Sequence, residues 1–423
     1  MGSPPTVSSL PVAQLAFSET PQKTPQKHYK VAEADLPKIE FRGRLCSSIE
    51  ELEALVGPWE RLIETAVRKN PFFDPDFLIP AFKHLNDDNS AQLLVIEAPQ
   101  RVNEQLPRVL CGLIPIKKKR FYGMPIRSYE SWKHDQCFDT TPLIRADVAT
   151  ETMSFMFDFI ATELKSSLFS FENVAGEGEF ARLLTHEFYQ NERTVFHRDA
   201  YNRACFIPEA DAETYIKSEV AKNTRKGTLR LERKLSGLGE MKTWVMQNDS
   251  DASKWAEEFL RLEGAGWKGK AGTAMSSTPS ETQFFREMIR RTHRAGKLSM
   301  VKIEFIGQPI SMICDVHQAS SAIHFKTAFD ETYSQYTPGL IAELKNIERL
   351  HGTNTEMMDS CAAPNHPMIN RVWSGRKRFQ SVVVATGKKT SRYATAIMPI
   401  MQLLKNIRQE KKLAKLAKSK SKA

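Results

Sequence analysis

The chain has 423 residues, of which 41% are hydrophobic and 26% are charged. This length suits two domains with unstructured ends better than a single core. No apolar run approaches the ~18 residues that cross a bilayer, and the N-terminus lacks the pattern of a signal peptide. The six cysteines show no paired spacing. We therefore expect a cytoplasmic protein without a membrane span.

The net charge of +10 lies mainly at one end of the chain. Residues 405–423 hold eight Lys or Arg and one Glu, a local charge of +7, which leaves +3 for the remainder. A tail without interleaved aromatic residues is typical of a solvated, solubilising segment. Nucleic acid is expected as a partner only through this tail, by non-specific attraction.

The first half begins with residues 1–37, which are rich in Pro, Ser, Thr and Gln and predict disorder. An amphipathic helix over 49–67, interrupted near Pro58, and a short helix ending near Leu85 follow. Residues 92–98 and 108–116 are typical of a hairpin, 150–164 of a helix and 168–174 of a strand.

The second half repeats this order of elements. Helices are predicted over 253–264 and 280–296, the second with a capping box of Ser280 and Gln283, and then a hairpin over 298–305 and 310–316 and a strand over 321–330. The duplication predicts an α+β protein of two like halves, residues 38–205 and 206–400. Residues 1–37 precede them as a disordered segment, and residues 401–423 follow as the basic tail. Between the halves, residues 210–234 predict a helix with one basic face, which is either a solvated surface or the border of a groove for a phosphate-bearing ligand.

The strand over 321–330 leads directly into a helix through Pro338-Gly339. Strict alternation would place Ile323, Phe325, Thr327 and Phe329 on one face and His324, Lys326 and Ala328 on the other. A helix beginning at the Pro-Gly turn leaves unpaired N–H groups at which an anionic group can bind. We therefore expect any chemistry to lie near this turn.

Two further segments each have a functional and a structural interpretation. Residues 262–274 combine four glycines with Trp267, Lys268 and Lys270, which suits either a substrate-contacting loop or a Trp closing the core. Residues 357–378 predict a strand, a loop and a short helix, in which Asp359 is either a catalytic residue or a helix cap.

Several familiar site patterns are missing from the sequence. It has no Gly-x-Ser-x-Gly elbow, no Walker loop, no Cys-x-x-Cys pair and no His-Glu-x-x-His motif. Gly176-Glu-Gly-Glu follows a strand, but its glutamates would repel a pyrophosphate. His317 and His324 are predicted on neighbouring strands, but the sequence offers no carboxylate that would complete a metal site with them. We therefore interpret both as packing or surface residues.

Three motifs, taken in order, carry a resemblance to a known family. They are Leu-Glu-x-x-Gly-Trp-Lys-Gly-x-x-Gly-Thr-Ala from Leu262, Phe-Lys-Thr-Ala-Phe-Asp-Glu-x-Tyr-x-x-Tyr-x-Pro-Gly from Phe325, and Asp-Ser-Cys-Ala-x-Pro-x-His-Pro-Met-Ile from Asp359. Together they resemble the GNAT-type acyltransferases described as cellulose-biosynthesis-related (CelD-like), which are related to FemAB-like transferases with two GNAT-like halves. The resemblance is specific over 224–378 and architectural over 40–205.

The resemblance implies two GNAT-like halves with mixed sheets flanked by helices. It also implies an acyl-CoA co-substrate, acetyl-CoA as the first choice, and a small-molecule or sugar-linked amine as acceptor, with direct attack and no metal. The alternatives are FemAB-like aminoacyl transfer from charged tRNA and a non-catalytic scaffold in polysaccharide assembly.

Such a reaction needs donors for the thioester oxygen, a base and a proton source. The residues predicted for catalysis are Tyr333 and Tyr336 as proton sources and Asp330, Glu331 or Asp359 as base. The residues predicted for the cofactor are Lys326, Pro338, Gly339 and Leu340, and those for the substrate are Trp267, Lys268, Thr273 and His366. The chain departs from the usual pyrophosphate loop of GNAT enzymes, since Pro338 removes one N–H donor.

Overall fold

The computed structural model describes residues 39–99, 108–120 and 126–387, and beyond them residues 399, 400, 403, 406, 407 and 410. The predicted N-terminal disorder and most of the basic tail lie outside the described residues. Residues 40–423 group into a single unit, to which the following description refers.

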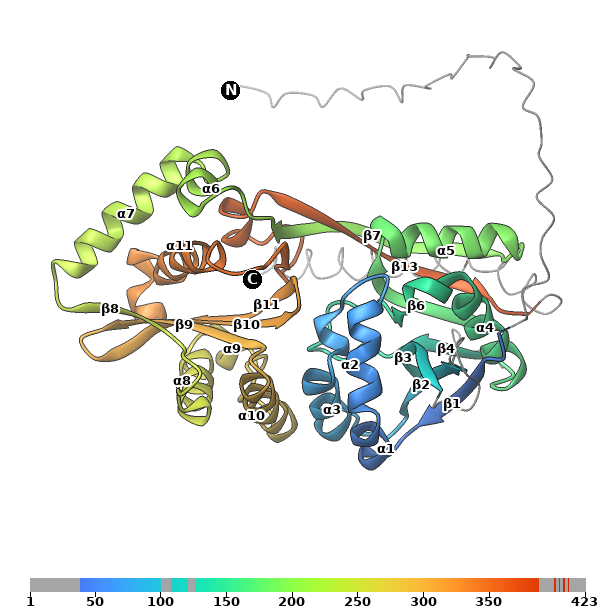
Figure 1. Ribbon diagram of the computed structural model, residues 1–423. Coiled ribbons are helices and arrows are strands. Elements are labelled where there is room, and N and C mark those ends of the chain that lie inside the picture. Colours follow the sequence, from blue (N-terminus) through green and yellow to red (C-terminus); the bar gives the residue numbers. More distant parts are fainter. Residues whose placement is uncertain are drawn as a thin grey trace, which may run out of the picture. The chain divides into compact units, whose positions relative to one another are not determined.

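One mixed sheet runs through both halves of the chain (Figure 1). Its strands, in spatial order, are β1 (Arg42–Cys46), β2 (Ala91–Ala98), β3 (Val109–Arg120), β4 (Arg127–Ser131), β6 (Leu168–Ala175), β13 (Gly375–Ala385), β7 (Val195–Phe206), β12 (Met357–Asp359), β11 (Ser321–Phe329), β10 (Gln308–Gln318), β9 (Leu298–Phe305) and β8 (Met241–Val245). The short β5 (Leu143–Ile144) pairs with β3 beside this path.

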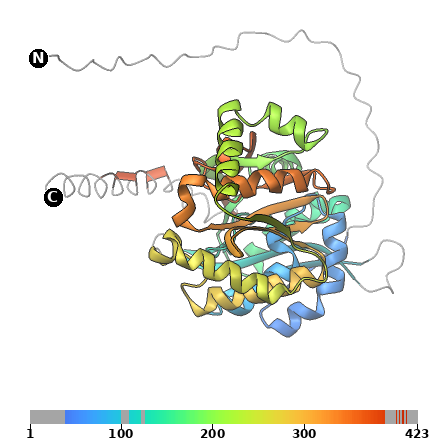
Figure 2. The ribbon, with the colours of Figure 1, turned by 90° about the vertical axis from the view of Figure 1, so that its left-hand side faces the viewer.

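Helices cover the sheet on both faces. They are α1 (Ile49–Ala54), α2 (Val56–Thr65), α3 (Pro75–His84), α4 (Ala149–Thr162), α5 (Gly178–Gln190), α6 (Ala212–Ser218), α7 (Lys222–Ser236), α8 (Ala252–Ala265), α9 (Trp267–Lys270), α10 (Pro279–Arg294) and α11 (Pro338–Leu350). In the second half, α8 and α10 lie on one side of β8–β11, and α7 and α11 on the other (Figures 1 and 2). The α+β class predicted from the sequence is thereby confirmed. Among the described residues, no helix combines the length and the apolar composition that a membrane span requires.

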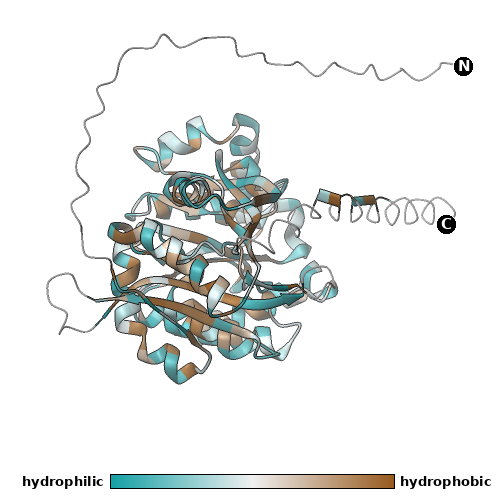
Figure 3. Cartoon of the chain, turned by 90° about the vertical axis from the view of Figure 1, so that its right-hand side faces the viewer, coloured by the Kyte–Doolittle hydropathy of each residue, from teal (hydrophilic) through white to brown (hydrophobic). Residues whose placement is uncertain are grey.

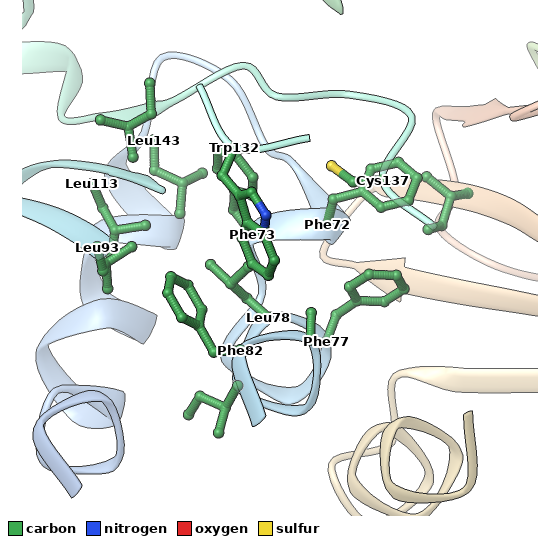
Figure 4. Packing of buried hydrophobic residues seen from close by; sticks show 14 of the residues in the cluster. Phe72, Phe73, Phe77, Leu78, Phe82, Leu93, Leu113, Trp132, Cys137 and Leu143 are labelled. Carbon is green, nitrogen blue, oxygen red and sulfur yellow. The ribbon is translucent and has the colours of Figure 1, made fainter. Parts of the chain in front are cut away.

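The largest core cluster is shared by the two halves. Phe77 of α3 contacts Phe284 of α10 and Phe325 of β11, with ring centroids 5.4 and 5.3 Å apart. Trp132 and Phe82 lie beside it, with centroids 4.8 Å apart (Figure 4). Because these aromatic residues come from both halves, the halves are joined by buried apolar contacts. Figure 3 colours the chain by hydropathy and shows long hydrophobic stretches along the strands, as expected for strands that line a buried core.

β13, the last strand that the structure describes, completes the middle of the sheet. β13 pairs antiparallel with β6 of the first half through Phe379↔Ala175 and with β7 through Gly375↔Cys205. β7 pairs in turn with β12 through Asp359↔Cys205. Consecutive strands β6 and β7 are therefore separated by a strand that the chain supplies only near its C-terminal end.

Four local predictions differ from the structure. The first helix breaks at Leu55, which caps α2, three residues before Pro58. The cap of α10 is Thr278, whose hydroxyl accepts from the N–H of Glu281, so Ser280 lies inside the helix. Residues 210–234 form two helices, α6 and α7, since residues 219–221 interrupt them. The fourth difference is a β-bulge in β11, which changes the side chains at the site described below.

Candidate active site

The site lies where two neighbouring parallel strands separate. β11 pairs with β12 only through Ser321↔Met357, Ala322↔Met358 and Ile323↔Asp359. β12 ends at Asp359, whereas β11 continues to Phe329. The free edge of β11 beyond Ile323 therefore faces the segment that follows β12.

A pocket of about 790 Å³ occupies this separation. Its walls come from the free part of β11, from the segment after β12, from the start of α11 and from α9. Aromatic and aliphatic side chains dominate, namely Phe138, Trp267, Phe325, Phe329, Leu340, Met368 and Ile369. Polar side chains also line it, among them His324, Lys326, His366 and Arg371, but most of the accessible wall is apolar, as is typical of a ligand site in which apolar walls bind and polar groups orient.

The start of α11 presents one unpaired backbone donor to this pocket. Leu340 and Ile341 both donate their N–H groups to the carbonyl of Thr337, and Pro338 has no N–H. Among the described residues, the N–H of Gly339 has no backbone acceptor. A Cβ on Gly339 would lie 3.1 Å from the sulfur of Met368, so glycine keeps this donor accessible. The N-terminus of a helix with a free N–H favours a negatively charged or polarised oxygen.

Two residues without glycine's freedom hold left-handed backbone conformations at the pocket. Thr337 has φ +52° and Cys361 has φ +53°, and both line the pocket. Such conformations cost about 1–2 kcal/mol each and persist where the surrounding structure imposes them. The hydroxyl oxygen of Thr337 is also buried without a hydrogen-bond partner in the described part of the chain.

A β-bulge in β11 changes the predicted alternation of side chains. Asp315 pairs with His324 and Cys314 with Lys326, so Phe325 has no partner on β10. The extra residue reverses the alternation beyond it. His324 and Thr327 therefore approach each other, with 2.7 Å between Nε2 and Oγ1, although strict alternation placed them on opposite faces.

His324 is the centre of a buried polar network. Its Nδ1 lies 2.9 Å from Oδ1 of Asp315, and its Nε2 lies 3.6 Å from Oε2 of Glu343. The other carboxylate oxygen of Asp315 accepts hydrogen bonds from Asn346 and Arg349, each at 2.9 Å. Oε1 of Glu343 accepts from the indole of Trp373 at 2.8 Å, whereas Oε2 is buried without a hydrogen-bond partner among the described residues.

The charges of this network oppose the effect of burial. Burial alone would lower the pKa of His324, but the carboxylates of Glu343 and Asp315 outweigh it and raise the pKa. Burial raises the pKa of Glu343. The pKa of Asp315 is lowered although burial opposes it, because His324 and Arg349 stabilise its charge. The histidine at the pocket wall is thus supported in its protonated form.

Lys326 is a pocket residue without a counter-ion. Its ammonium has no hydrogen bond or ion pair with any residue that the structure describes. Burial lowers its pKa, and the charge of Glu263 only partly offsets this. Glu263 itself accepts from Lys268 at 2.8 Å and from the N–H of Met275 at 2.8 Å. Lys326 is therefore free to bind an anionic ligand group.

The remaining predicted residues divide between the pocket and its surroundings. Trp267, Lys268, His366, Pro338, Gly339 and Leu340 line the pocket together with Lys326. Nδ1 of His366 accepts from the N–H of Ile369 at 3.2 Å, and burial lowers the pKa of this histidine. Thr273 is exposed and does not line the pocket.

The five residues predicted for catalysis lie outside the pocket wall. Tyr336 is buried in a core cluster with Ile341, and Tyr333 packs against the same cluster. Asp330 caps the 3₁₀ turn Glu331–Tyr336 by accepting from the N–H of Thr332. Glu331, its alternative, accepts from the N–H of Trp267 at 2.5 Å and pairs with Lys270 at 3.0 Å.

Asp359 is paired inside the protein. Arg203 of β7 donates to both carboxylate oxygens, at 2.6 and 2.7 Å, and Lys377 of β13 lies 3.6 Å away. Burial would raise the pKa of Asp359, but Arg203 and Lys377 lower it to about 2. This carboxylate is therefore a permanent counter-ion that joins β12 to β7 and β13, and its affinity for a proton is too weak for a base near neutral pH.

No chemical role of His324 or Thr327 follows from the sequence alone. Asp315 is nine residues before His324 and meets it only because β10 and β11 are neighbours. The sequence does place the carboxylate of Asp315 in the predicted hairpin. Only the antiparallel register between β10 and β11 shows that this carboxylate lies beside His324. Within the described residues, no group of three His, Cys, Asp or Glu side chains is placed to hold a metal ion.

Comparison with known proteins agrees with this geometry. Residues 222–366, which contain the pocket strand and α11, match a family described as an acetyltransferase (GNAT) domain. None of the curated proteins compared with the chain matches it in sequence.

Solved structures show similar folds at low sequence identity. A crystal structure of FemX is 8% identical with a TM-score of 0.52, over 77% of this chain and 95% of FemX. A tandem GNAT protein from the clavulanic acid biosynthesis pathway is 12% identical with a TM-score of 0.42, over 83% of this chain and all (100%) of that one. The C-terminal domain of a putative lysylphosphatidylglycerol synthetase from Agrobacterium fabrum is 10% identical with a TM-score of 0.46, over 84% and 97%. The chain thus has an α+β fold in which residues 222–366 match a GNAT domain, and its likeness to FemX is one of fold.

Proposed function

We propose that this protein is an N-acyltransferase that moves an acyl group from acyl-CoA, most simply acetyl-CoA, to an amine of a small molecule or of an envelope or polysaccharide precursor. The observation that carries the proposal is the pocket between β11 and the segment after β12, which ends at the free N–H of Gly339. The match of residues 222–366 to a GNAT domain supports the same reaction class. The polysaccharide context rests on the resemblance of the motifs to the CelD-like group.

The pocket offers the features that acyl transfer needs. Strand separation exposes backbone groups of β11, against which an extended acyl-bearing arm can lie. The N–H of Gly339 is a donor for an anionic or thioester oxygen at the helix start. Lys326 supplies an unpaired cation for a phosphate of the donor or a carboxylate of the acceptor. The largely apolar walls disfavour water, which competes with the amine for the thioester.

FemAB-like aminoacyl transfer from charged tRNA is the second candidate. The fold likeness to FemX favours it, and so does the basic face of α7, on which Lys222, Lys226, Arg230, Arg233 and Lys234 are exposed. Contacts with phosphates would make RNA binding fall steeply with salt concentration. A scaffold without catalysis is the alternative from another class, and it requires no donor binding at all.

Donor binding separates these functions. We would titrate the full chain with acetyl-CoA, longer acyl-CoAs and free CoA by calorimetry and by thermal shift. A ligand at 100 times its dissociation constant stabilises the native state by about 2.7 kcal/mol. Gly339→Val should abolish binding, because even the Cβ crowds Met368. Gly227→Val is the matched control, since a Cβ on Gly227 of α7 has no neighbour within 4 Å.

The outcomes point in different directions. Binding that Gly339→Val removes and Gly227→Val keeps would support the proposed donor site and justify a screen of acceptor amines. Absence of binding for every acyl-CoA would refute the acyl-CoA reaction. Charged tRNA would then be tested at several salt concentrations, with and without residues 405–423.

A further inference from the structure

The bulge at Phe325 builds a linear arrangement of Asp315, His324 and Thr327. Asp315 on β10 is buried, and its Oδ1 lies 2.9 Å from Nδ1 of His324. Nε2 of the same ring lies 2.7 Å from the hydroxyl of Thr327. His324 and Thr327 both line the pocket, whereas Asp315 does not. The line therefore leads from a buried carboxylate to a hydroxyl at the pocket surface.

The partners of the ring fix its tautomer. The carboxylate of Asp315 is ionised, held by Arg349 and Asn346, and can only accept a hydrogen bond. Nδ1 of His324 therefore carries the proton in the neutral ring. Nε2 is then an acceptor, and the hydroxyl of Thr327 donates to it. This leaves the lone pairs of the Thr327 oxygen available to accept a proton from a group in the pocket.

We propose that Asp315, His324 and Thr327 form a proton relay that serves as the general base of the acyl transfer, with Thr327 as the catalytic residue that touches the acceptor amine and Asp315 as a positioning residue. The inference rests on the proposed function and adds the base that it lacks. Asp330 and Asp359, predicted for this task, lie outside the pocket wall.

The step conserves atoms and charge. The amine nitrogen attacks the thioester carbonyl, the C–N bond forms, and the C–S bond breaks as the thiolate leaves. The proton lost by the amine passes to Oγ1 of Thr327 while the hydroxyl proton passes to Nε2 of His324. The imidazolium then returns this proton, through Oγ1 of Thr327, to the thiolate, and amide and free thiol result.

Glu343 is placed to stabilise the positive charge of the His324 imidazolium. Its Oε2 is buried without a hydrogen bond in the described part of the chain and lies 3.6 Å from Nε2 of His324. A proton arriving on Nε2 gives this oxygen a charged partner. The groups facing the ring are Asp315 from β10, Glu343 and Arg349 from α11, Thr327 from β11 itself, His366 from the segment after β12, and Trp373, whose ring centroid lies 5.4 Å away.

The sign of the pH dependence follows from these charges. Only the neutral ring can accept a proton, so the rate of transfer rises with pH through the pKa of His324. Glu343 and Asp315 raise this pKa against the effect of burial. Glu343→Gln removes one negative charge but keeps an acceptor for Trp373, so it should move the acidic limb of the rate profile to lower pH.

The first experiment measures transfer from bound acetyl-CoA to the best amine of the acceptor screen, in single turnovers between pH 5 and 9. We expect His324→Gln to lower the rate about 10²-fold or more. Thr327→Val should lower it about tenfold, whereas Thr327→Ser keeps the hydroxyl and should restore most of it. His197→Gln is the control, because His197 is exposed on β7, outside the pocket. Calorimetry with acetyl-CoA on each variant shows that the donor still binds.

The second experiment follows His324 by NMR in the protein without substrate. We expect a lower pKa of its ring in Glu343→Gln than in the wild type, and Nδ1 protonated in the neutral form. Wild-type rates and an unchanged pH profile in His324→Gln would overturn the relay, as would a ring that does not titrate. A protein that binds no acyl-CoA would refute the proposed function instead, and the tautomer and titration of His324 would then decide the relay separately.

Discussion

Replacing Asp359 by asparagine should destabilise the protein, because it removes the counter-ion of a buried arginine. Arg203 is 1% exposed and donates two hydrogen bonds to Asp359, while Lys377 lies 3.6 Å from the same carboxylate. The pKa of Asp359 is lowered from 3.8 to about 2. At 1.36 kcal/mol for each pKa unit, this difference corresponds to about 2 kcal/mol of stability above pH 4.

The Asp359→Asn substitution would also leave the guanidinium of Arg203 without a charged partner. Breaking one side of a buried pair costs about 3–5 kcal/mol, more than the titration of the carboxylate alone. For a protein of this size each kcal/mol changes the melting temperature by about 2 °C, so Asp359→Asn should lower it by about 6–10 °C. Loss of the Asp359 carboxylate should cost less at Lys377 than at Arg203, because burial already lowers the pKa of Lys377.

Thermal unfolding followed by circular dichroism tests this expectation. The control is Glu213→Gln, which breaks an exposed pair with Lys217 on α6 and should change the melting temperature by less than about 1 °C. The pH dependence supplies a second test. Because the folded pKa of Asp359 is depressed, its contribution is present above pH 4 and is lost as the pH falls toward 2, and the asparagine variant should lack this part of the acid sensitivity. A melting temperature within 2 °C of wild type would refute the assignment of Asp359 as a buried counter-ion.

Two further predictions concern the core and the pocket. Phe77→Ala should cost about 3–5 kcal/mol, measured by urea unfolding, because Phe77 is fully buried against Phe284 and Phe325, and a loss below 1 kcal/mol would contradict this packing. Lys326→Met should leave the melting temperature unchanged or raise it, because a desolvated ammonium without a counter-ion is replaced by an apolar side chain, while the affinity for CoA, measured by calorimetry, falls at least about tenfold. A lower melting temperature in Lys326→Met would indicate a structural partner for this ammonium.

Local patterns in the sequence predict much of the second half correctly. The hairpin of β9 and β10, the strand β11 and the helices α8 and α11 all follow from hydrophobic periodicity and from turn residues. The pocket also lies beside the Pro338-Gly339 turn, where the sequence places it. Each of these elements has a short-range cause, which a sequence read locally can reveal.

Long-range pairing explains what the sequence does not reveal. The sequence of β7 is largely polar and does not predict a strand. In the structure its first residues are exposed or half-buried, and only Arg203–Phe206 are buried. β13 begins Gly-Arg-Lys-Arg, which is typical of a solvated segment, yet Lys377 is buried beside Asp359. The relay depends on the bulge at Phe325, and a bulge is set by the register with β10. Such positions are determined by partners that are distant in sequence.

The central position of β13 has a consequence for how the chain can be made and divided. While the polypeptide is being synthesised, β6 and β7 exist long before β13, and each exposes an edge that can pair with another chain. A fragment ending at residue 205 would keep these edges open permanently and should aggregate. The first half therefore completes its part of the sheet only after β13 has been synthesised, so a cell would have to protect the growing chain until that strand is available.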